Sequence, residues 1–259
     1  MNIENVLRWI EKADVDYFTQ FIKAWIPFNA WYKITFPSLD SDRAIINEIK
    51  RSSNTFSNTI ANLLSGNSQE SKNFKNIIGE LHNSLLQYTI NNEGNRLTFE
   101  KIIIERNINR LIDHDYRGIH YHIEREDDGN KLKKITIAIR NSSTTLYSKT
   151  QTKFDFNEIE RESNYLALSP ERQSILKSKY KEIDPYLQIS LLDNNCANPT
   201  LCGAFKFTNI EEKIVKGVIE MLYLLRCVLF HGELVPNEGA REIYKYAYEI
   251  LLVILKKIR

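Results

Sequence analysis

Residues 214–232 read IVKGVIEMLYLLRCVLFHG and are the most strongly patterned segment of the chain. Apolar side chains recur there at helical spacing and share one face: Ile214, Val215, Val218, Leu222, Leu225 and Leu229. Thr208 and Glu211 stand just upstream at the spacing of a capping box, and Gly232 stands where a left-handed residue would end a helix. The pattern predicts one long core helix that ends at His231 and Gly232.

Amphipathic segments on both sides of this helix predict its partners. Residues 14–36 form one predicted helix with an aromatic stripe: Phe18, Phe21, Trp25, Phe28 and Tyr32. Asn29 falls within that stripe, so its amide needs hydrogen-bond partners there. Further helices are predicted over 42–64, 68–88, 99–112, 171–183 and 240–258.

The pattern changes in the middle of the chain. Ile119–Glu124 and Leu132–Arg140 alternate in polarity around Asp128-Gly129, which is a hairpin signal, and Thr144–Phe156 is a candidate third strand. The sequence therefore predicts a single domain over residues 1–259. We expect it to be mainly α, a helical bundle with a small β-hairpin or β-sheet insertion at about residues 115–156.

Composition limits the possible classes of function. The chain has 259 residues, of which 42% are hydrophobic and 26% charged, with a net charge of only +2, so any nucleic-acid contact must come from a local basic cluster. Cys196, Cys202 and Cys227 fit no zinc spacing and are interpreted as reduced thiols. Residues 1–13 lack the apolar run of a signal peptide, and the apolar segments are too short to cross a bilayer. We expect a cytoplasmic protein with no membrane partner.

Arg226 and His231 carry the most specific chemistry in the sequence. The helix dipole favours a protonated His231 and a nearby arginine opposes it, so this histidine can transfer protons near neutral pH. A guanidinium can stabilise a five-coordinate phosphate by bidentate contact. Together they suit RNA cleavage by the 2′-hydroxyl, which needs no metal and leaves a cyclic phosphate.

A five-residue offset places the side chains of Arg226 and His231 about 140° apart on a straight helix. Either the helix relaxes before Gly232, or the partner residue comes from another subunit.

Three motifs together resemble the HEPN ribonuclease superfamily. The first is Arg-x4-His followed by glycine, at Arg226, His231 and Gly232, at the end of a long bundle helix. The second is FIKAWIPFNAWY at 21–32, which resembles the first helix of HEPN proteins from phage-defence loci. The third is AREIYKYAY at 240–248, which resembles the helix after the catalytic motif. The resemblance covers the two ends of the chain and does not account for the middle.

The resemblance implies a HEPN-type, metal-independent endoribonuclease without a cofactor, acting as a toxin or anti-phage defence effector. It implies a homodimer that binds RNA and is controlled by an antitoxin or sensor protein. Arg226 and His231 would be catalytic, with Asn29, Cys227 and Gly232 in support. The family usually has a polar residue after the arginine, where this chain has Cys227, which puts one supporting hydrogen bond in doubt. Asn29 could equally be a core amide. The alternative is a catalytically inactive HEPN scaffold that binds RNA or a protein.

A second group of polar residues lies in the predicted β region. His120, His122 and Glu124 alternate along one strand and share a face, and Asp113, His114 and Asp115 come just before them. Two histidines and a carboxylate can bind zinc or another divalent metal. Because the spacing matches no known metal motif, the sequence favours an exposed polar strand face. A third interpretation is that these histidines line the RNA groove.

Overall fold

The computed structural model describes Ile3 and residues 15–105, 109–128, 131–142, 144–185 and 187–258; the predicted turn residue Gly129 lies outside these ranges. The chain divides into two compact units. The first, called here the helical unit, combines Met1–Ile104 with Gln188–Arg259. The second, called here the sheet unit, is Glu105–Leu187. It contains the β segment predicted at about 115–156 and extends beyond it on both sides.

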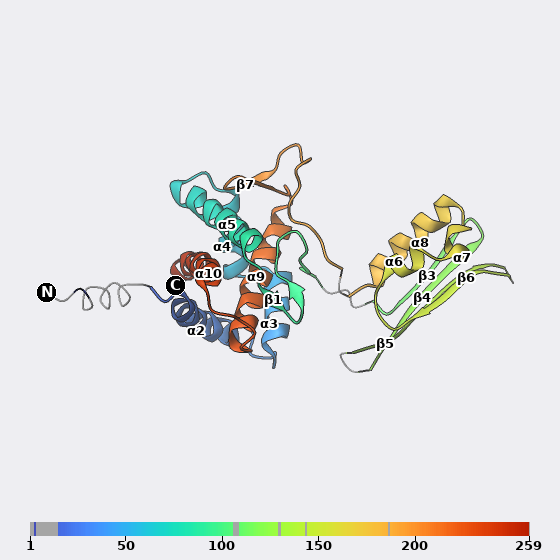
Figure 1. The fold of residues 1–259 in the computed structure, drawn as a ribbon, viewed down its shortest axis with the longest axis horizontal. Helices are drawn as coiled ribbons and strands as arrows, with labels where there is room; N and C mark the ends of the chain where they lie inside the picture. The colour runs from blue at the N-terminus through green and yellow to red at the C-terminus, as the bar shows by residue number, and fades with distance from the viewer. Residues whose placement is uncertain are drawn as a thin grey trace. The chain divides into compact units, whose positions relative to one another are not determined.

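The described residues of the helical unit form six long helices (Figure 1). In chain order they are α2 (Tyr17–Thr35), α3 (Asp42–Arg51), α4 (Thr55–Ser65), α5 (Gln69–Gln87), α9 (Glu211–Phe230) and α10 (Glu238–Lys257). Two small antiparallel ribbons join them: β1 (Asn91–Asn92) with β2 (Asn95–Arg96), and β7 (Thr200–Cys202) with β8 (Phe205–Phe207). The predicted helices over 14–36, 42–64, 68–88 and 240–258 are confirmed within a few residues at each end.

The core of the helical unit forms around α9, which is buried over most of its surface and contacts α3, α4 and α10. Its C-terminal end is as predicted: Gly232 has a φ of +70°, and the N–H of Glu233 donates to the carbonyl of Val228 at 3.1 Å, as in a Schellman motif. The predicted capping box is wrong. The Thr208 hydroxyl accepts from the N–H of Ile210 at 3.3 Å, and Ile210 occupies the N-cap without a side-chain bond.

The sheet unit consists of a four-stranded antiparallel sheet with helices on one face (Figure 1). Its strands follow chain order: β3 (Leu111–Tyr116), β4 (Ile119–Asp128), β5 (Lys131–Asn141) and β6 (Thr144–Gln151). The helices are α6 (Phe156–Glu160), α7 (Ser163–Leu166) and α8 (Pro170–Ile183). Alternate residues of β4, such as Tyr121 and Ile123, are buried in a core shared with the helices. The other residues of each strand face away from that core, which leaves the opposite face of the sheet polar.

The predicted fold class, mainly α, is wrong, because the described residues are 52% helix and 20% strand and therefore mixed α/β. The β region is not a small insertion on a bundle, since four strands and their helices enclose a separate hydrophobic core. The helix predicted over 99–112 does not form at residues 99–105 or 109–112, and residues 106–108 lie outside the described ranges. Ile102 pairs instead with Ile189 in an antiparallel bridge, and Leu111 begins β3. The run of β-branched isoleucines at 102–104 disfavours a helix there.

Among the described residues, no helix combines the length and the apolar character that crossing a bilayer requires.

Candidate functional site

Arg226 lies near the end of α9 and faces the start of α3. Its Nη2 donates to Oδ2 of Asp42 at 3.0 Å, with the two side chains 19% and 24% exposed. The guanidinium carbon also lies 4.6 Å from the ring centroid of Phe230, one turn further along the helix. The Nε of Arg226 is buried and has no hydrogen-bond partner among the described residues. Arg226 is therefore held by one carboxylate and one ring and still has donors to offer.

Asp42 connects Arg226 to the first long helix. It is the first residue of α3, where the helix dipole favours a negative charge. The buried hydroxyl of Tyr32 donates to Asp42 and accepts from the Nδ2 of Asn29. Burial raises the pKa of Tyr32 most, and the hydrogen bond and charge of Asp42 raise it further, so the phenol stays neutral. Asn29, Tyr32, Asp42 and Arg226 form one continuous network, called here the Arg226 network.

A second ion-pair cluster lies beside this network, between the same two helices. Glu220 of α9 is 4% exposed and accepts from Arg43 Nη1 and from Lys50 Nζ, each at 2.6 Å. Arg43 also stacks over the ring of Tyr223 at 4.2 Å. A buried carboxylate is costly unless it is paired, and here two cations from α3 pair with it. The α3–α9 interface is therefore specified by charge as well as by packing.

Cys227 turns away from Arg226 and toward Tyr223. The pKa of Tyr223 is raised to about 12, mainly by burial. The charge of Cys227 and a hydrogen bond with Cys227 raise it further. Cys227 is 7% exposed and packs in the core. Its side chain therefore supports the buried side of α9, and it makes no described contact with the guanidinium of Arg226.

His231 lies beyond the last helical residue of α9, at the C-cap. Its backbone N–H donates to the carbonyl of Cys227 at 2.9 Å, and its side chain is exposed. Among the described residues, the imidazole makes no hydrogen bond, ion pair or ring contact. The structure therefore brings Arg226 and Asn29 into one network but does not bring His231 to Arg226. Gly232 supplies the positive φ that ends the helix just after this histidine.

Sequence reasoning missed Asp42 and Tyr32 as site residues. Tyr32 was assigned only to the aromatic stripe, although its offset of three from Asn29 places both on one helix face. Asp42 follows a serine at a predicted helix start, which is an ordinary place for a carboxylate. Asp42 and Arg226 are 184 positions apart in the sequence, so no local sequence pattern indicates that they pair.

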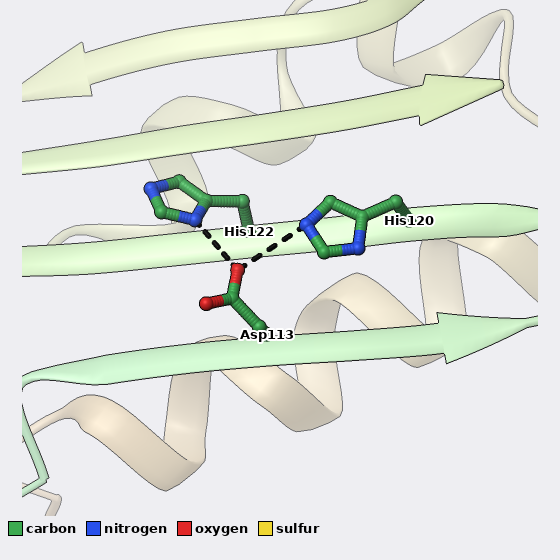
Figure 2. A group of neighbouring side chains, drawn as sticks. All are labelled: Asp113, His120 and His122. Carbon is green, nitrogen blue, oxygen red and sulfur yellow. Dashed lines mark hydrogen bonds and ion pairs between the residues drawn. The ribbon is translucent and has the colours of Figure 1, made fainter. Parts of the chain in front are cut away.

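The sheet unit carries a separate cluster on its open face, shown in Figure 2. Oδ1 of Asp113 lies 2.7 Å from Nδ1 of His122 and 3.2 Å from Nε2 of His120. Cross-strand pairing places these groups together, because Asp113 on β3 is directly opposite His122 on β4. We call Asp113, His120 and His122 the histidine–aspartate cluster. Their ligand-type atoms all lie within 4.8 Å of one another.

Two further carboxylates contact this cluster from outside. Oδ1 of Asp115 lies 2.8 Å from Nδ1 of His120, and Oε2 of Glu124 lies 3.8 Å from Nε2 of His122. The hydrogen bond with His122 is the main cause that lowers the pKa of Asp113. The sequence had grouped Glu124 with the two histidines. The structure instead places Asp113 between them, because β3 pairs with β4 in a register that the alternation along β4 alone cannot reveal.

Comparisons with protein-family models, with curated proteins and with solved structures find no match to this chain. The resemblance to the HEPN superfamily therefore stays a prediction that is carried by the sequence motifs.

Proposed function

We propose that the protein is a metal-independent endoribonuclease of the HEPN type, with its active site at the C-terminal end of α9. The observation that carries the proposal is the Arg226 network. It is a polar chain from Asn29 to Arg226, set in an aromatic and aliphatic core, at the helix end that also bears the exposed His231. Buried polar groups cost stability, so such a network is more readily explained by function than by packing.

The residues divide the chemistry of cleavage between them. His231 removes the proton from the 2′-hydroxyl or donates one to the leaving oxygen, which requires the solvent access that it has. Arg226 stabilises the extra charge on the phosphate with donors that Asp42 does not use. Asp42 and Tyr32 position the guanidinium. The products are a 2′,3′-cyclic phosphate and a 5′-hydroxyl.

A homodimer completes this proposed site. Arg226 and His231 make no contact within one chain, so His231 of a second copy would act beside Arg226 of the first. Two large apolar side chains near His231 in the sequence are open to a partner: Phe230 is 51% exposed and Val235 is 74% exposed. The physiological role that we propose is a cytoplasmic toxin or anti-phage effector, controlled by an antitoxin or sensor protein.

The first experiment measures RNA cleavage by the full chain in EDTA, with mass spectrometry of the product ends. We expect His231→Ala and Arg226→Lys to reduce the rate by about 100-fold or more. Arg226→Lys keeps the charge and removes the bidentate geometry. His114→Ala and Arg51→Ala are the matched controls, since His114 belongs to the sheet unit and Arg51 is an exposed residue of α3. We expect the wild-type product to carry cyclic-phosphate ends, and full activity of His231→Ala would overturn the assignment.

A mixing experiment tests whether the site is shared between two chains. Inactive His231→Ala and inactive Arg226→Lys chains are combined and allowed to exchange subunits. A composite site predicts recovered activity, because the mixed dimer pairs an intact Arg226 with an intact His231. A site contained in one chain, after a local relaxation of the helix, predicts no recovery.

The second candidate function is a HEPN scaffold that binds RNA or a protein without cutting. It is favoured by the ion pair that already holds Arg226 and by the burial of Cys227 where the family usually has a polar residue. RNA that is bound and recovered uncut, with the same affinity in His231→Ala, would select this alternative.

A further inference from the structure

We propose that the histidine–aspartate cluster on the sheet unit is a binding site for one divalent transition-metal ion, with Zn²⁺ as the ion that fits best. The proposed site is independent of the ribonuclease, which lies in the helical unit and requires no metal. It uses Nε2 of His120, Nδ1 of His122 and a carboxylate oxygen of Asp113.

The donor atoms suit this class of ion in type and in spacing. Two imidazole nitrogens and one carboxylate oxygen form a ligand set found in zinc and in iron(II) sites. Zinc bonds of about 2.0–2.2 Å place tetrahedral ligand atoms about 3.3 Å apart. Oδ1 of Asp113 already lies 3.2 Å from His120 and 2.7 Å from His122. A small rotation of one carboxylate would admit an ion between the three residues.

Charge balance supports a cation at this point. Both ring nitrogens of His120 face carboxylates: Nδ1 faces Asp115 at 2.8 Å and Nε2 faces Asp113 at 3.2 Å. A neutral imidazole has only one N–H to donate, so it cannot satisfy both contacts. A metal ion bound to Nε2 and to Asp113 resolves this conflict without a protonated ring. At His122, Nδ1 lies 2.7 Å from Asp113, and Nε2 lies 3.8 Å from Glu124, which is beyond hydrogen-bond distance.

The two outer carboxylates have the arrangement that metal-bound histidines commonly show. Asp115 accepts the N–H of His120 and thereby fixes the tautomer that offers Nε2 as a ligand. Glu124 is placed to do the same for Nε2 of His122 once its Nδ1 binds metal. Each ligating ring would then have its own carboxylate partner, which aligns the ring and increases its basicity.

The strands hold the ligands in place before any ion arrives. Asp113 is directly opposite His122, and Asp115 is directly opposite His120, in the register of β3 and β4. The two strands are joined by a tight turn in which Arg117 and Gly118 have φ values of +49° and +75°. A site on paired strands is more rigid than one on a loop, so binding orders little chain.

The site is open on its outer side. The side chains of Asp113, His120 and His122 are 45%, 37% and 26% exposed, so water can occupy the remaining coordination position. Three protein ligands with one open position are characteristic of zinc sites that bind or activate a further ligand, rather than of closed structural sites.

The test is titration of the metal-free full chain with Zn²⁺ by calorimetry, and with Co²⁺ by visible spectroscopy. We expect one ion per chain and tetrahedral Co²⁺ absorption bands. Asp113→Asn and His122→Ala should each weaken binding by well over 10-fold. Asp115→Asn should weaken it by about 10- to 100-fold, because it only orients a ligand.

The control is His114→Ala, which removes a histidine of β3 on the opposite face of the sheet from Asp113, beside Tyr121 at a ring distance of 6.1 Å. It should leave the affinity for Zn²⁺ unchanged, and circular dichroism should show that every variant is folded. Zn²⁺ binding that is absent, or that survives both Asp113→Asn and His122→Ala, would overturn the proposal. So would binding that is lost in His231→Ala.

Discussion

The two units of this protein differ in how deeply their paired ionisable residues are buried. Glu220 of the helical unit is 4% exposed and accepts from two cations, whereas the Asp113 side chain of the sheet unit is 45% exposed and lies within 3.2 Å of two histidine rings. Removing a partner from a buried pair leaves a charge without water, and removing one at a surface does not. The polar groups of the helical unit should therefore determine stability, while those of the sheet unit can be changed with little effect on folding. Four predictions test this contrast.

The largest effect is expected at Glu220. Glu220→Leu leaves Lys50 buried without its carboxylate and should lower the free energy of unfolding by about 3 to 5 kcal/mol. Urea unfolding followed by tryptophan fluorescence measures this unit selectively, because the sheet unit contains no tryptophan. The control Glu48→Ala removes the exposed partner of Arg51 and should cost less than about 1 kcal/mol. Adding Lys50→Met to Glu220→Leu should recover much of the loss. If Glu220→Leu and Glu48→Ala lowered the free energy of unfolding equally, the proposed difference between buried and exposed ion pairs would be wrong.

The second effect is a pH dependence at His82. This histidine is 1% exposed among phenylalanine rings, and burial lowers its pKa below the ordinary value. The unfolded chain then binds the proton more readily, so stability is full above about pH 6.5 and falls as the pH drops below it, by at most about 1.4 kcal/mol per pH unit. His82→Leu should abolish this slope between pH 7 and pH 5, measured by the same tryptophan signal. A slope that is unchanged in His82→Leu would assign the acid sensitivity to another group.

The corresponding pH range for the sheet unit is more acidic. The pKa of Asp113 is lowered, mainly by the hydrogen bond with His122. Its contribution is therefore present above the ordinary pKa of about 3.8 and is lost only as the pH falls through the lower folded value. Acidification to pH 5 should thus affect the helical unit through His82 and leave the contribution of Asp113 intact.

A third, intermediate effect is expected at Tyr32. Tyr32→Phe keeps the ring in the core but removes the hydroxyl that links Asn29 to Asp42, at a cost of about 1 kcal/mol. If the Arg226 network positions the guanidinium, the cleavage rate should also fall, with the loss in kcat rather than in KM. Tyr246→Phe is the matched control, because its hydroxyl donates to a partly exposed glutamate on its own helix. A full cleavage rate in stable Tyr32→Phe would limit the network to a structural role.

The smallest effect is expected at Asp113. Asp113→Asn should change stability by less than about 0.5 kcal/mol, because the side chain is half exposed and solvent screens its charge. Near-ultraviolet circular dichroism of the tyrosines in the sheet unit measures this unfolding. The same variant is expected to lose Zn²⁺ binding, so function and stability separate at this position. A loss of several kcal/mol would show that the cluster stabilises the sheet instead.

The sequence predicted the elements that depend on local contacts better than those that depend on contacts far along the chain. The apolar periodicity of 214–232 and the glycine at its end depend on neighbours within a few residues, and both the helix and its stop are confirmed. The capping box failed because Thr208 bonds its nearest available N–H, that of Ile210, instead. The helix expected over 99–112 failed because Ile102 finds its partner at Ile189, far along the chain.

The candidate sites follow the same rule. Arg226 and Asn29 were predicted from local motifs, but the residues that join them, Tyr32 and Asp42, become partners only when α2 and α3 meet α9. His120 and His122 were placed on one strand face correctly, since alternation is local. Asp113 joins them only through the β3–β4 register, which periodicity does not specify.

The bridge between Ile102 and Ile189 has a consequence for how the chain can be divided. Each residue donates its N–H to the carbonyl of the other at 3.0 Å, and both belong to the helical unit. The bridge therefore holds close together the segment at which the chain leaves the helical unit, near Ile104, and the segment at which it returns, near Gln188. The entropy of closing a loop grows only slowly with its length, so a clamp of this kind tolerates inserts of very different sizes. The Ile102–Ile189 bridge thus makes the junction a natural graft point, at which an intervening module can be gained, exchanged or lost while the fold around it persists.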